Sequence, residues 1–235
     1  MKPMIDFHSH ILPGVDHGCS DIGEALRQLE IVRNAGVDTV VATPHFYPNA
    51  IDIESFLQKV DGSLAQLLAA DITSIPTVHV GAEVLYCNSL EQMEGLERLC
   101  IRGTTLLLLE LPLEPWNDAL FYTVEVLLKR FTVVLAHIDR YARHQCQELS
   151  ELLAMGAFAQ INTASLLSFG MRRRLRSFLG SPSLVAIGSD LHGAKSELYG
   201  QFLSAQKYLG EEAGAILQRS HQLLKDAIPL QAIPK

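Results

Sequence analysis

The sequence has few of the features that would place the chain in a membrane, in an oxidising compartment or on nucleic acid. No stretch approaches the roughly 18 apolar residues that a membrane-spanning helix needs, and no secretory signal precedes the first apolar run. The four cysteines are scattered without a Cys-x-x-Cys pair, which favours buried free thiols over a disulfide framework. Lys and Arg number 19 against 26 Asp and Glu, and the net charge of −7 disfavours nucleic acid as a partner. We therefore expect a cytoplasmic protein without a membrane span.

The composition indicates a folded domain with a sizeable core. Hydrophobic residues make up 48% of the chain and charged residues only 19%, a balance that disfavours disorder. A length of 235 residues suits one large α/β domain, and a barrel can use all of it, so we expect residues 1–235 to form a single domain. The one basic cluster, "RRRLR" at Arg172–Arg176, is typical of the solvated face of a helix.

Short apolar runs alternate along the chain with longer amphipathic segments. The runs are rich in Val, Leu and Ile, as in strands buried on both faces of a parallel sheet, and cover residues 4–7, 37–43, 77–84, 104–111, 131–137, 157–162 and 184–190. Helices are predicted over residues 20–36, 53–70, 116–131, 145–156, 164–180, 197–209 and 211–226. The first helix has a capping-box pattern, Asp21 with Glu24, and ends at Gly36. This alternation predicts an α/β fold of βαβ units, wound into a sheet or a barrel.

Nearly every apolar run ends in a side chain that can bind a metal ion. The candidate ligands are His8, His10, His17, His45, Glu83, Glu110, His137, Asp190 and His192, with Asp16 nearby. In a parallel barrel the carboxyl ends of all strands form one rim, where active sites lie. One histidine after a strand is weak evidence, but the joint pattern predicts a metal centre on that rim. We assign His79, His144 and His221, which lack this placement, to structure or surface.

The chemistry of this ligand set limits the metals and the reaction. Nine or ten candidate ligands suit two or three ions, and imidazole with carboxylate donors suits zinc, manganese or iron rather than calcium. Such a cluster lowers the pKa of a water molecule and directs it at an electrophile. Amidohydrolases also begin with His-x-His, but their dinuclear form uses a carboxylated lysine at a strand end, and no lysine of this chain lies there. Mononuclear amidohydrolases need no such lysine.

Seven motifs resemble those of the PHP (polymerase and histidinol phosphatase) family of metallophosphoesterases. They are "MIDFHSHILPGVDHG", "GVDTVVATPHF", "GAEV", "LLLLELP", "VVLAHIDRY", "QINTASLL" and "VAIGSDLHG", in the family's order between residues 4 and 193. They are most similar to those of the CpsB/YwqE-like group, the bacterial tyrosine-protein phosphatases of capsular and exopolysaccharide loci. The resemblance implies a distorted seven-stranded (β/α) TIM-like barrel, the PHP fold, three metal ions and hydrolysis of phosphotyrosine on a protein.

The resemblance also implies how the ligands divide among the ions. The first ion would have His8, His10, Glu83 and Asp190, the second would share Glu83 and add Glu110 and His137, and the third would have His45, His192 and one residue of the Asp16-His17-Gly18 triplet. Manganese is the first candidate metal, with iron and zinc as alternatives. Arg140, in "HIDRY", matches the arginine that binds the substrate phosphate, and its planar guanidinium suits two phosphate oxygens.

The sequence departs from the family's pattern at two places. The capsule phosphatases usually have Asp-Asp-Gly where this chain has Asp16-His17-Gly18. We favour His17 as the ligand, with Asp16 hydrogen-bonding another ligand, although Asp16 stays an alternative. After "SDLHG" the family often has a second arginine, whereas this chain has only Lys195, so the second phosphate contact is open. The cluster Arg172–Arg174 could substitute for it.

The expected reaction is hydrolysis of a phosphomonoester. A hydroxide between metal ions attacks phosphorus in line while Arg140 binds the phosphate. A tyrosyl leaving group, with an ordinary pKa of about 10, needs a general acid less than an alkyl alcohol does, and His17 and Asp139 are the candidates for that role. The cysteines offer no alternative nucleophile, because none begins the Cys-x5-Arg loop of cysteine phosphatases.

The resemblance implies a phosphotyrosine protein as the substrate, in particular a membrane-associated tyrosine autokinase that controls capsule or exopolysaccharide synthesis. Two alternatives stay open. One is a phosphatase for a small molecule such as histidinol phosphate, and the other is a regulatory metal-binding barrel without catalysis. The sequence reveals neither the metal nor the oligomeric state, so an oligomer stays open as well.

Overall fold

The strands and helices are those of a computed structural model that describes residues 4–70, 75–193 and 196–232. The strands are β1 (Met4–His10), β2 (Val37–Ala42), β3 (His45–Phe46), β4 (Thr77–Val80), β5 (Glu83–Leu85), β6 (Leu106–Glu110), β7 (Thr132–Leu135), β8 (Phe158–Asn162), β9 (Leu184–Gly188) and β10 (Leu191–His192). The α-helices are α1 (Ile22–Asn34), α2 (Ile53–Ala69), α3 (Asp118–Leu128), α4 (Cys146–Ala154), α5 (Thr163–Leu167), α6 (Phe169–Leu179), α7 (Ser196–Leu209) and α8 (Glu211–Leu223). The 3-10 helices are η1 (Leu90–Gln92), η2 (Leu96–Leu99), η3 (Ile138–Arg140) and η4 (Leu230–Ala232). Among the described helices, none has the length and apolar character needed to cross a membrane.

The strands form two sheets in which every described pair is parallel. One sheet has the order β10-β1-β2-β4, and the other has the order β3-β5-β6-β7-β8-β9. Leucine-rich β6 lies between β5 and β7, and Leu106–Leu109 are all buried, as the near-continuous apolar run predicts for a strand covered on both faces. The predicted α/β class with parallel strands is therefore confirmed.

The strand count differs from the prediction, because the sequence predicts seven strands and the described residues form ten. The chain changes sheet four times, and three of these changes interrupt a predicted strand run or follow it within a few residues: between β2 and β3, between β4 and β5, and between β9 and β10. Pro44, which has no N–H to donate to a ladder, lies at the first break. At the second break Gly81 lies so close to the backbone of Ile101 that a Cβ would be 3.1 Å from its Cα. These interruptions are local and leave the apolar pattern of each run unchanged.

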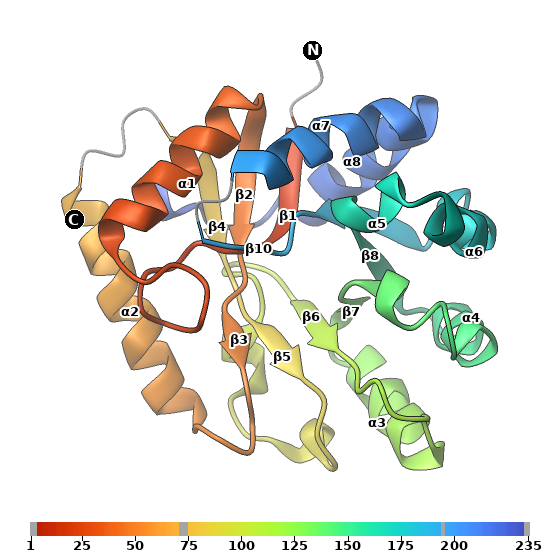
Figure 1. The fold of residues 1–235 in the computed structure, drawn as a ribbon. Helices are drawn as coiled ribbons and strands as arrows, with labels where there is room; N and C mark the ends of the chain where they lie inside the picture. Colours follow the sequence, from red (N-terminus) through yellow and green to blue (C-terminus); the bar gives the residue numbers. More distant parts are fainter. Residues whose placement is uncertain (1–3, 71–74, 194–195, 233–235) are drawn as a thin grey trace.

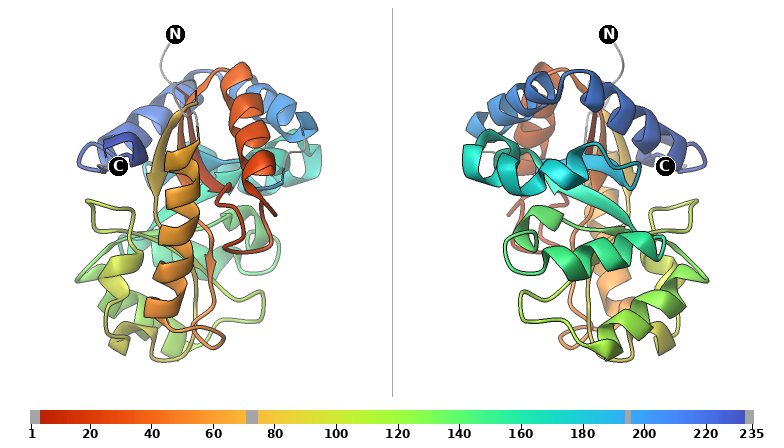
Figure 2. Two further views of the ribbon diagram at one scale, coloured as in Figure 1. Left: turned by 90° about the vertical axis from the view of Figure 1, so that its left-hand side faces the viewer. Right: turned by 90° about the vertical axis from the view of Figure 1, so that its right-hand side faces the viewer.

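The helices cover the outer side of the strands. In Figure 1, α1 and α2 lie on one side of the strands, α3 to α6 lie on the other, and α7 and α8 lie across one end; the two side views of Figure 2 show the same arrangement. Asp21 caps α1 as predicted, because its carboxylate accepts a hydrogen bond from the Glu24 backbone N–H at 2.9 Å. Gly36 follows the helix with a φ of 84°, the left-handed conformation expected of a glycine that ends a helix.

The helix predicted over residues 164–180 is two helices, α5 and α6, separated at Ser168. The backbone of Ser168 is extended (φ −82°, ψ 120°), and its hydroxyl accepts a hydrogen bond from Met171 N at 3.4 Å, which caps α6. Arg173 and Arg176 on α6 are exposed, in agreement with the solvated helix face expected for this cluster. The sequence pattern missed the break because Ser168 has helix-compatible apolar neighbours on both sides.

Candidate metal centre

The predicted ligands converge in one cluster, although His45 and Glu83 are the first residues of β3 and β5 and not the last residues of a strand. His8 and His10 lie inside β1 rather than after it, and their spacing of two residues puts both imidazoles on one side of the strand. Their Nε2 atoms face each other at 3.1 Å, and both side chains are fully buried. The other members of the cluster are His45 from β3, Glu83 from β5, Glu110 from β6, His137 after β7, Asp190 after β9 and His192 from β10.

Glu83 lies at the centre of this cluster. Its Oε1 accepts a hydrogen bond from His137 Nε2 at 2.7 Å. Its Oε2 has three imidazole nitrogens around it, His45 Nδ1 at 2.8 Å, His8 Nε2 at 3.2 Å and His10 Nε2 at 3.4 Å. None of the three is aligned for a hydrogen bond, so Oε2 is buried without a hydrogen-bond partner among the described residues. A fully buried carboxylate oxygen that faces several ring nitrogens fits a bound cation.

Asp190 also has a buried carboxylate oxygen that faces several ring nitrogens. Its Oδ1 is buried without a hydrogen-bond partner in the described part of the chain. The nearest ring nitrogens are His10 Nε2 at 3.4 Å, His192 Nδ1 at 3.7 Å and His8 Nε2 at 3.8 Å. Three groups of residues have ligand atoms within 4.8 Å of one another: His8, His10 and Asp190; His45, Glu83 and Glu110; and His10, His45 and His192. This set of nitrogen and oxygen donors suits transition-metal ions.

Two amide side chains of β8 form hydrogen bonds with the ligands and with each other. Gln160 Oε1 accepts hydrogen bonds from His8 Nδ1 at 3.2 Å and from the His137 backbone N–H at 2.6 Å. Gln160 Nε2 donates to Asn162 Oδ1 at 3.0 Å, and Asn162 Nδ2 donates to Asp190 Oδ2 at 2.8 Å. Because Nδ1 of His8 is used as a donor, its Nε2 is left free to face the cluster. The sequence motif "QINTASLL" contains both amides but did not predict these roles.

The Asp16-His17-Gly18 triplet lies against the cluster through its aspartate. Asp16 Oδ2 accepts hydrogen bonds from His10 Nδ1 at 2.7 Å and from the His45 backbone N–H at 2.9 Å, and Oδ1 accepts from Gly18 N at 2.8 Å. Both oxygens are thus used within the protein. The exposed ring of His17 stacks on His45 and His192, with centroids 4.8 and 4.5 Å away. His17 is therefore beside the cluster, but it is not in any of the three groups of close ligand atoms.

Arg140 extends over the cluster from η3. Its two terminal nitrogens donate to Glu110 Oε1 at 3.2 Å and to Asp190 Oδ2 at 2.6 Å, and its side chain is 38% exposed. The guanidinium is thus at the solvent side of the same carboxylates that face the histidines. A phosphoryl group at this opening would meet a fixed cation with two parallel donors.

The backbone around two of the ligands is strained. Only three described non-glycine residues have a positive φ, and two of them are His137 (31°) and Asp190 (52°). Left-handed φ values are uncommon in non-glycine residues, although Asp and His adopt them more often than most, and they recur at functional sites. Gly188, at the end of β9, passes so close to β1 that an added Cβ would be 2.5 Å from the His8 Cβ.

The electrostatics of the cluster depend on its buried charges. Burial lowers the pKa of His8, but the carboxylates of Glu83 and Asp190 outweigh it and raise that pKa to about 10. Burial raises the pKa of Glu83, yet the facing histidines hold it well below its usual range. The pKa of Glu110 is raised, by burial first and then by the charge of Glu83. Unlike the pKa of His8, the pKa of His192 is lowered, to about 4, first by burial and then by the neighbouring His10.

The remaining predicted residues lie outside this cluster. Asp139 is buried on the far side of Arg140, and its oxygens accept from Asn162 N at 2.9 Å and Ser165 Oγ at 2.6 Å. His79 is buried in β4, His221 is on α8, and His144 is exposed, in agreement with their assignment to structure or surface. Lys195 lies outside the described residues.

Comparisons with known proteins find relatives of one kind. The profile of a family described as "Capsular polysaccharide synthesis, CpsB/CapC" matches residues 4–220. The tyrosine-protein phosphatase YwqE of Bacillus subtilis is 28% identical over 239 residues, which covers 94% of this chain and 91% of YwqE. The tyrosine-protein phosphatase CpsB of Streptococcus agalactiae is 26% identical over 201 residues, 80% of this chain and 83% of CpsB. The putative tyrosine-protein phosphatase CapC of Staphylococcus aureus is 30% identical over 202 residues, 80% of this chain and 77% of CapC.

Solved structures share the fold. A chain from crystal structures of YwqE from Bacillus subtilis and CpsB from Streptococcus pneumoniae, described as unique metal-dependent tyrosine phosphatases, matches with a TM-score of 0.78 and 22% identity over 96% of both chains. An inactive dihydroorotase-like domain of a Chaetomium thermophilum CAD-like multifunctional protein matches with a TM-score of 0.56 and 9% identity, over 94% of this chain and 79% of that domain. At these identities the likeness shows a common fold alone.

Proposed function

The chain belongs to the CpsB/CapC family of capsular polysaccharide synthesis proteins, and from that premise we propose that it is a metal-dependent protein-tyrosine phosphatase. Its relatives are named as tyrosine-protein phosphatases, and the YwqE and CpsB structures are described as metal-dependent. The substrate class is then a protein that carries phosphotyrosine. A tyrosine autokinase that controls capsule or exopolysaccharide synthesis is the partner we propose within that class.

The observation that carries this proposal is the pair of buried carboxylate oxygens, Glu83 Oε2 and Asp190 Oδ1, that have no hydrogen-bond partner among the described residues. Each faces ring nitrogens that are not aligned to donate a hydrogen bond to it. Leaving two such oxygens buried costs several kcal/mol if nothing binds them, on the order of 1–3 kcal/mol each and more for a charged group. Cations at these positions would satisfy both oxygens and the surrounding imidazoles together.

We propose three metal ions, manganese first, with iron or zinc as alternatives. The proposed ligands are His8, His10, Glu83 and Asp190 for one ion, Glu83, Glu110 and His137 for a second, and His45, His192 and His17 for a third. Two of the three close groups, one around His8, His10 and Asp190 and one around His45, Glu83 and Glu110, support the first two assignments in part. His17 is preferred over Asp16 because both Asp16 oxygens already accept hydrogen bonds within the protein.

The bound metals would supply a water molecule of lowered pKa and would neutralise charge on the phosphoryl oxygens. The protein's own residues do the rest. Arg140 binds the phosphate with two donors and orients it at the opening of the cluster. His17, exposed beside His45 and His192, is our candidate for giving a proton to the leaving oxygen only in the alternative in which Asp16 is the third-metal ligand, because a metal-bound imidazole is not a proton donor of this kind. Asp139, the other candidate, is held by Asn162 and Ser165, which supports a role in positioning the loop that carries Arg140.

We propose that the strands close into one barrel of seven interrupted strand units, the PHP fold. In this description β2 continues as β3, β4 as β5, and β9 as β10. Two pairings support closure: β10 pairs with β1, and β9 pairs with β8, with only Ser189 and Asp190 between β9 and β10. The family match over residues 4–220 and the coverage of YwqE support a single domain over residues 1–235.

A cytoplasmic location is part of the proposal, and the state of the thiols supports it. All four cysteines are free, as the sequence predicts. Cys19 and Cys100 are buried as expected, whereas Cys146 is exposed. An exposed free thiol suits a reducing compartment.

Substitution of the proposed ligands tests the function. We expect His8→Ala and Asp190→Ala to abolish hydrolysis of a phosphotyrosine peptide, and to lower the metal content measured by elemental analysis, while circular dichroism shows a folded protein. His221→Ala, a substitution of a helix histidine outside the cluster, is the matched control and should keep wild-type activity. Histidinol phosphate assayed beside the peptide separates the small-molecule alternative. Bound metal without turnover of either phosphoester would instead indicate a metal-binding barrel without catalysis.

A further inference from the structure

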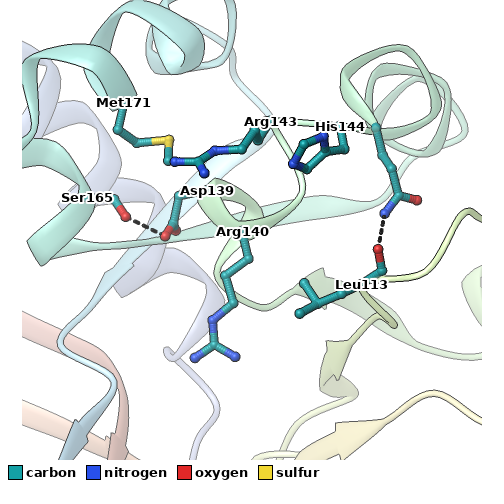
Figure 3. A pocket seen from close by; sticks show the side chains of 8 residues that line it. Leu113, Asp139, Arg140, Arg143, His144, Ser165 and Met171 are labelled. Carbon is teal, nitrogen blue, oxygen red and sulfur yellow. Dashed lines mark hydrogen bonds between the residues drawn. The ribbon is translucent and has the colours of Figure 1, made fainter.

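A second cavity lies beside the metal centre and shares Arg140 with it. The cavity has a volume of about 390 Å³, within the roughly 300–1,000 Å³ typical of ligand sites. Its walls come from the segment after β6, from η3 and the turn that follows it, and from α5 and α6, and they include Leu113, Arg143, His144 and Met171. Figure 3 shows these side chains around the opening. The proposed reaction uses Arg140 from this lining, and Asp139 to position the loop that carries it, so the other lining residues have no assigned role.

Arg143 is the cation of this cavity that has no carboxylate partner. It is exposed, and within the described ranges it forms no ion pair with an acidic side chain. Asp139 is the acidic residue in the lining, but its oxygens accept from the Asn162 N–H and the Ser165 hydroxyl instead. Arg140 is in a different position, because its guanidinium already donates to Glu110 and Asp190.

The side chains of Arg140 and Arg143 extend in different directions. In Figure 3 the Arg140 side chain extends away from the cavity toward the strand ends, whereas Arg143 extends along the cavity beside Met171. A phosphate at Arg140 would therefore leave Arg143 free to bind another anionic group of the same substrate. Leu113, which is 66% exposed, and Met171 offer apolar contacts on either side. An extended peptide that places its phosphotyrosine at Arg140 presents the residue two positions away on the same face, about 6.6–7.2 Å further along the chain.

We propose that this cavity receives the residue two positions from phosphotyrosine and selects an acidic side chain there, with Arg143 as the specificity-determining residue. The inference rests on the proposed function, because it concerns the same substrate. Arginine is suited to the task, since its planar fork binds a carboxylate with two parallel hydrogen bonds. The whole chain has a net charge of −7, which repels an acidic peptide. Binding of such a peptide therefore requires a local cation.

The test is a ratio of kcat/KM values measured on matched peptides. The peptides differ only in the residue two positions from phosphotyrosine, on either side, which is Glu, Gln or Lys. For the wild-type protein we expect Glu to be preferred over Gln by about fivefold, the effect of one partly exposed charge-assisted contact. Arg143→Ala should bring this ratio to about one, and Arg143→Glu should make Lys the preferred residue. A ratio is unaffected by any uniform loss of activity, and metal content checks that the centre is intact.

The control is Arg176→Ala, which removes the same charge from an exposed position of α6 outside this cavity. It should keep the wild-type ratio. An equal loss of preference in Arg176→Ala would mean that the overall field of the protein, and not this cavity, selects the peptide. A wild-type protein that hydrolyses Glu and Gln peptides equally overturns the inference and leaves the proposed function standing. A wild-type protein that hydrolyses none of the peptides overturns both.

Discussion

Gln160 provides the sharpest test of how the metal centre is assembled. This fully buried amide touches no substrate, but its Oε1 accepts from His8 Nδ1 and from the His137 N–H, and its Nε2 donates to Asn162. Gln160→Leu keeps much of the volume and removes all three hydrogen bonds. His8 would lose the partner that fixes its ring, and the His137 N–H would be buried without an acceptor.

The expected magnitude follows from these contacts. Loss of a hydrogen bond behind a metal-binding histidine lowers metal affinity by about 10–100-fold. The orphaned His137 N–H and Asn162 Oδ1 each cost on the order of 1–3 kcal/mol of stability. That sum, about 2–6 kcal/mol, is a large part of the roughly 5–15 kcal/mol that keeps a domain folded. Gln160→Glu is the matched variant, because it retains the acceptor for His8 and His137, although it loses the donor to Asn162 and adds a buried negative charge.

The assay is metal binding by isothermal titration calorimetry, with urea unfolding of the metal-free protein measured in parallel. Gln160→Leu should bind metal at least tenfold more weakly, and Gln160→Glu should stay closer to wild type. Ser220→Ala, which removes a buried 2.6 Å hydrogen bond to Val185 O away from the cluster, should lower stability without changing metal affinity. A folded Gln160→Leu protein with wild-type affinity would refute the reasoning, and so would equal losses in the Leu and Glu variants.

Three further predictions concern protons and close packing. The carboxylates of Glu83 and Asp190 outweigh burial and raise the pKa of His8 to about 10, so His8 carries a proton at neutral pH that a metal must displace. Metal affinity should thus fall as the pH falls, and calorimetry in two buffers of different ionisation enthalpy should show about one proton released near pH 7; no release would contradict this. Burial raises the pKa of Asp6 to about 6 from 3.8, so the folded metal-free state binds this proton more tightly than the unfolded state does. Its stabilising effect is present at low pH and is lost as the pH rises through about 6, and relative to Asp6→Asn the wild-type protein should gain about 1 kcal/mol of unfolding free energy between pH 7 and pH 5. An unchanged difference between the two proteins would count against this. Gly188→Ala would put a Cβ 2.5 Å from the His8 Cβ, and we expect it to weaken metal binding at least tenfold, as for other displaced ligands. Gly62→Ala, in open space on α2, is the control and should be neutral or stabilising.

The ligand set could be predicted because parallel strands align their carboxyl ends. Each apolar run contains a strand, so a polar residue at the end of one run is brought to the same place as a polar residue at the end of another. His8, Glu83 and Asp190 meet for this reason although they are far apart in the sequence. The same logic did not reveal that His8 and His10 lie inside β1, since the first apolar run is shorter than its strand.

The hydrogen bonds behind the ligands could not be predicted. Gln160 and His8 are 152 residues apart, and an amide on a buried strand carries no local signal of which histidine it will meet. The left-handed backbone at His137 and Asp190 also could not be predicted, because Asp and His adopt it more often than most residues but still only in a small minority of cases. Both features depend on tertiary contacts that override local preference.

The breaks in the strands and in the helix over residues 164–180 had weak sequence signals. Pro44 marks the first break, since proline cannot donate to a ladder. Ser168 caps α6, but a serine inside an amphipathic pattern is common enough that the pattern alone favours one long helix. Pro44 and Ser168 are both compatible with a break, but only the neighbouring elements of the structure show that a break occurs at each place.

The central claim is that metal held by this cluster is required for hydrolysis of phosphotyrosine. The most direct measurement strips the wild-type protein with a chelator, adds metal back in steps, and compares phosphate release from a phosphotyrosine peptide with metal bound per chain by elemental analysis. We predict no activity in the stripped protein and activity that rises with bound metal. Full activity in protein that contains no metal would contradict the account.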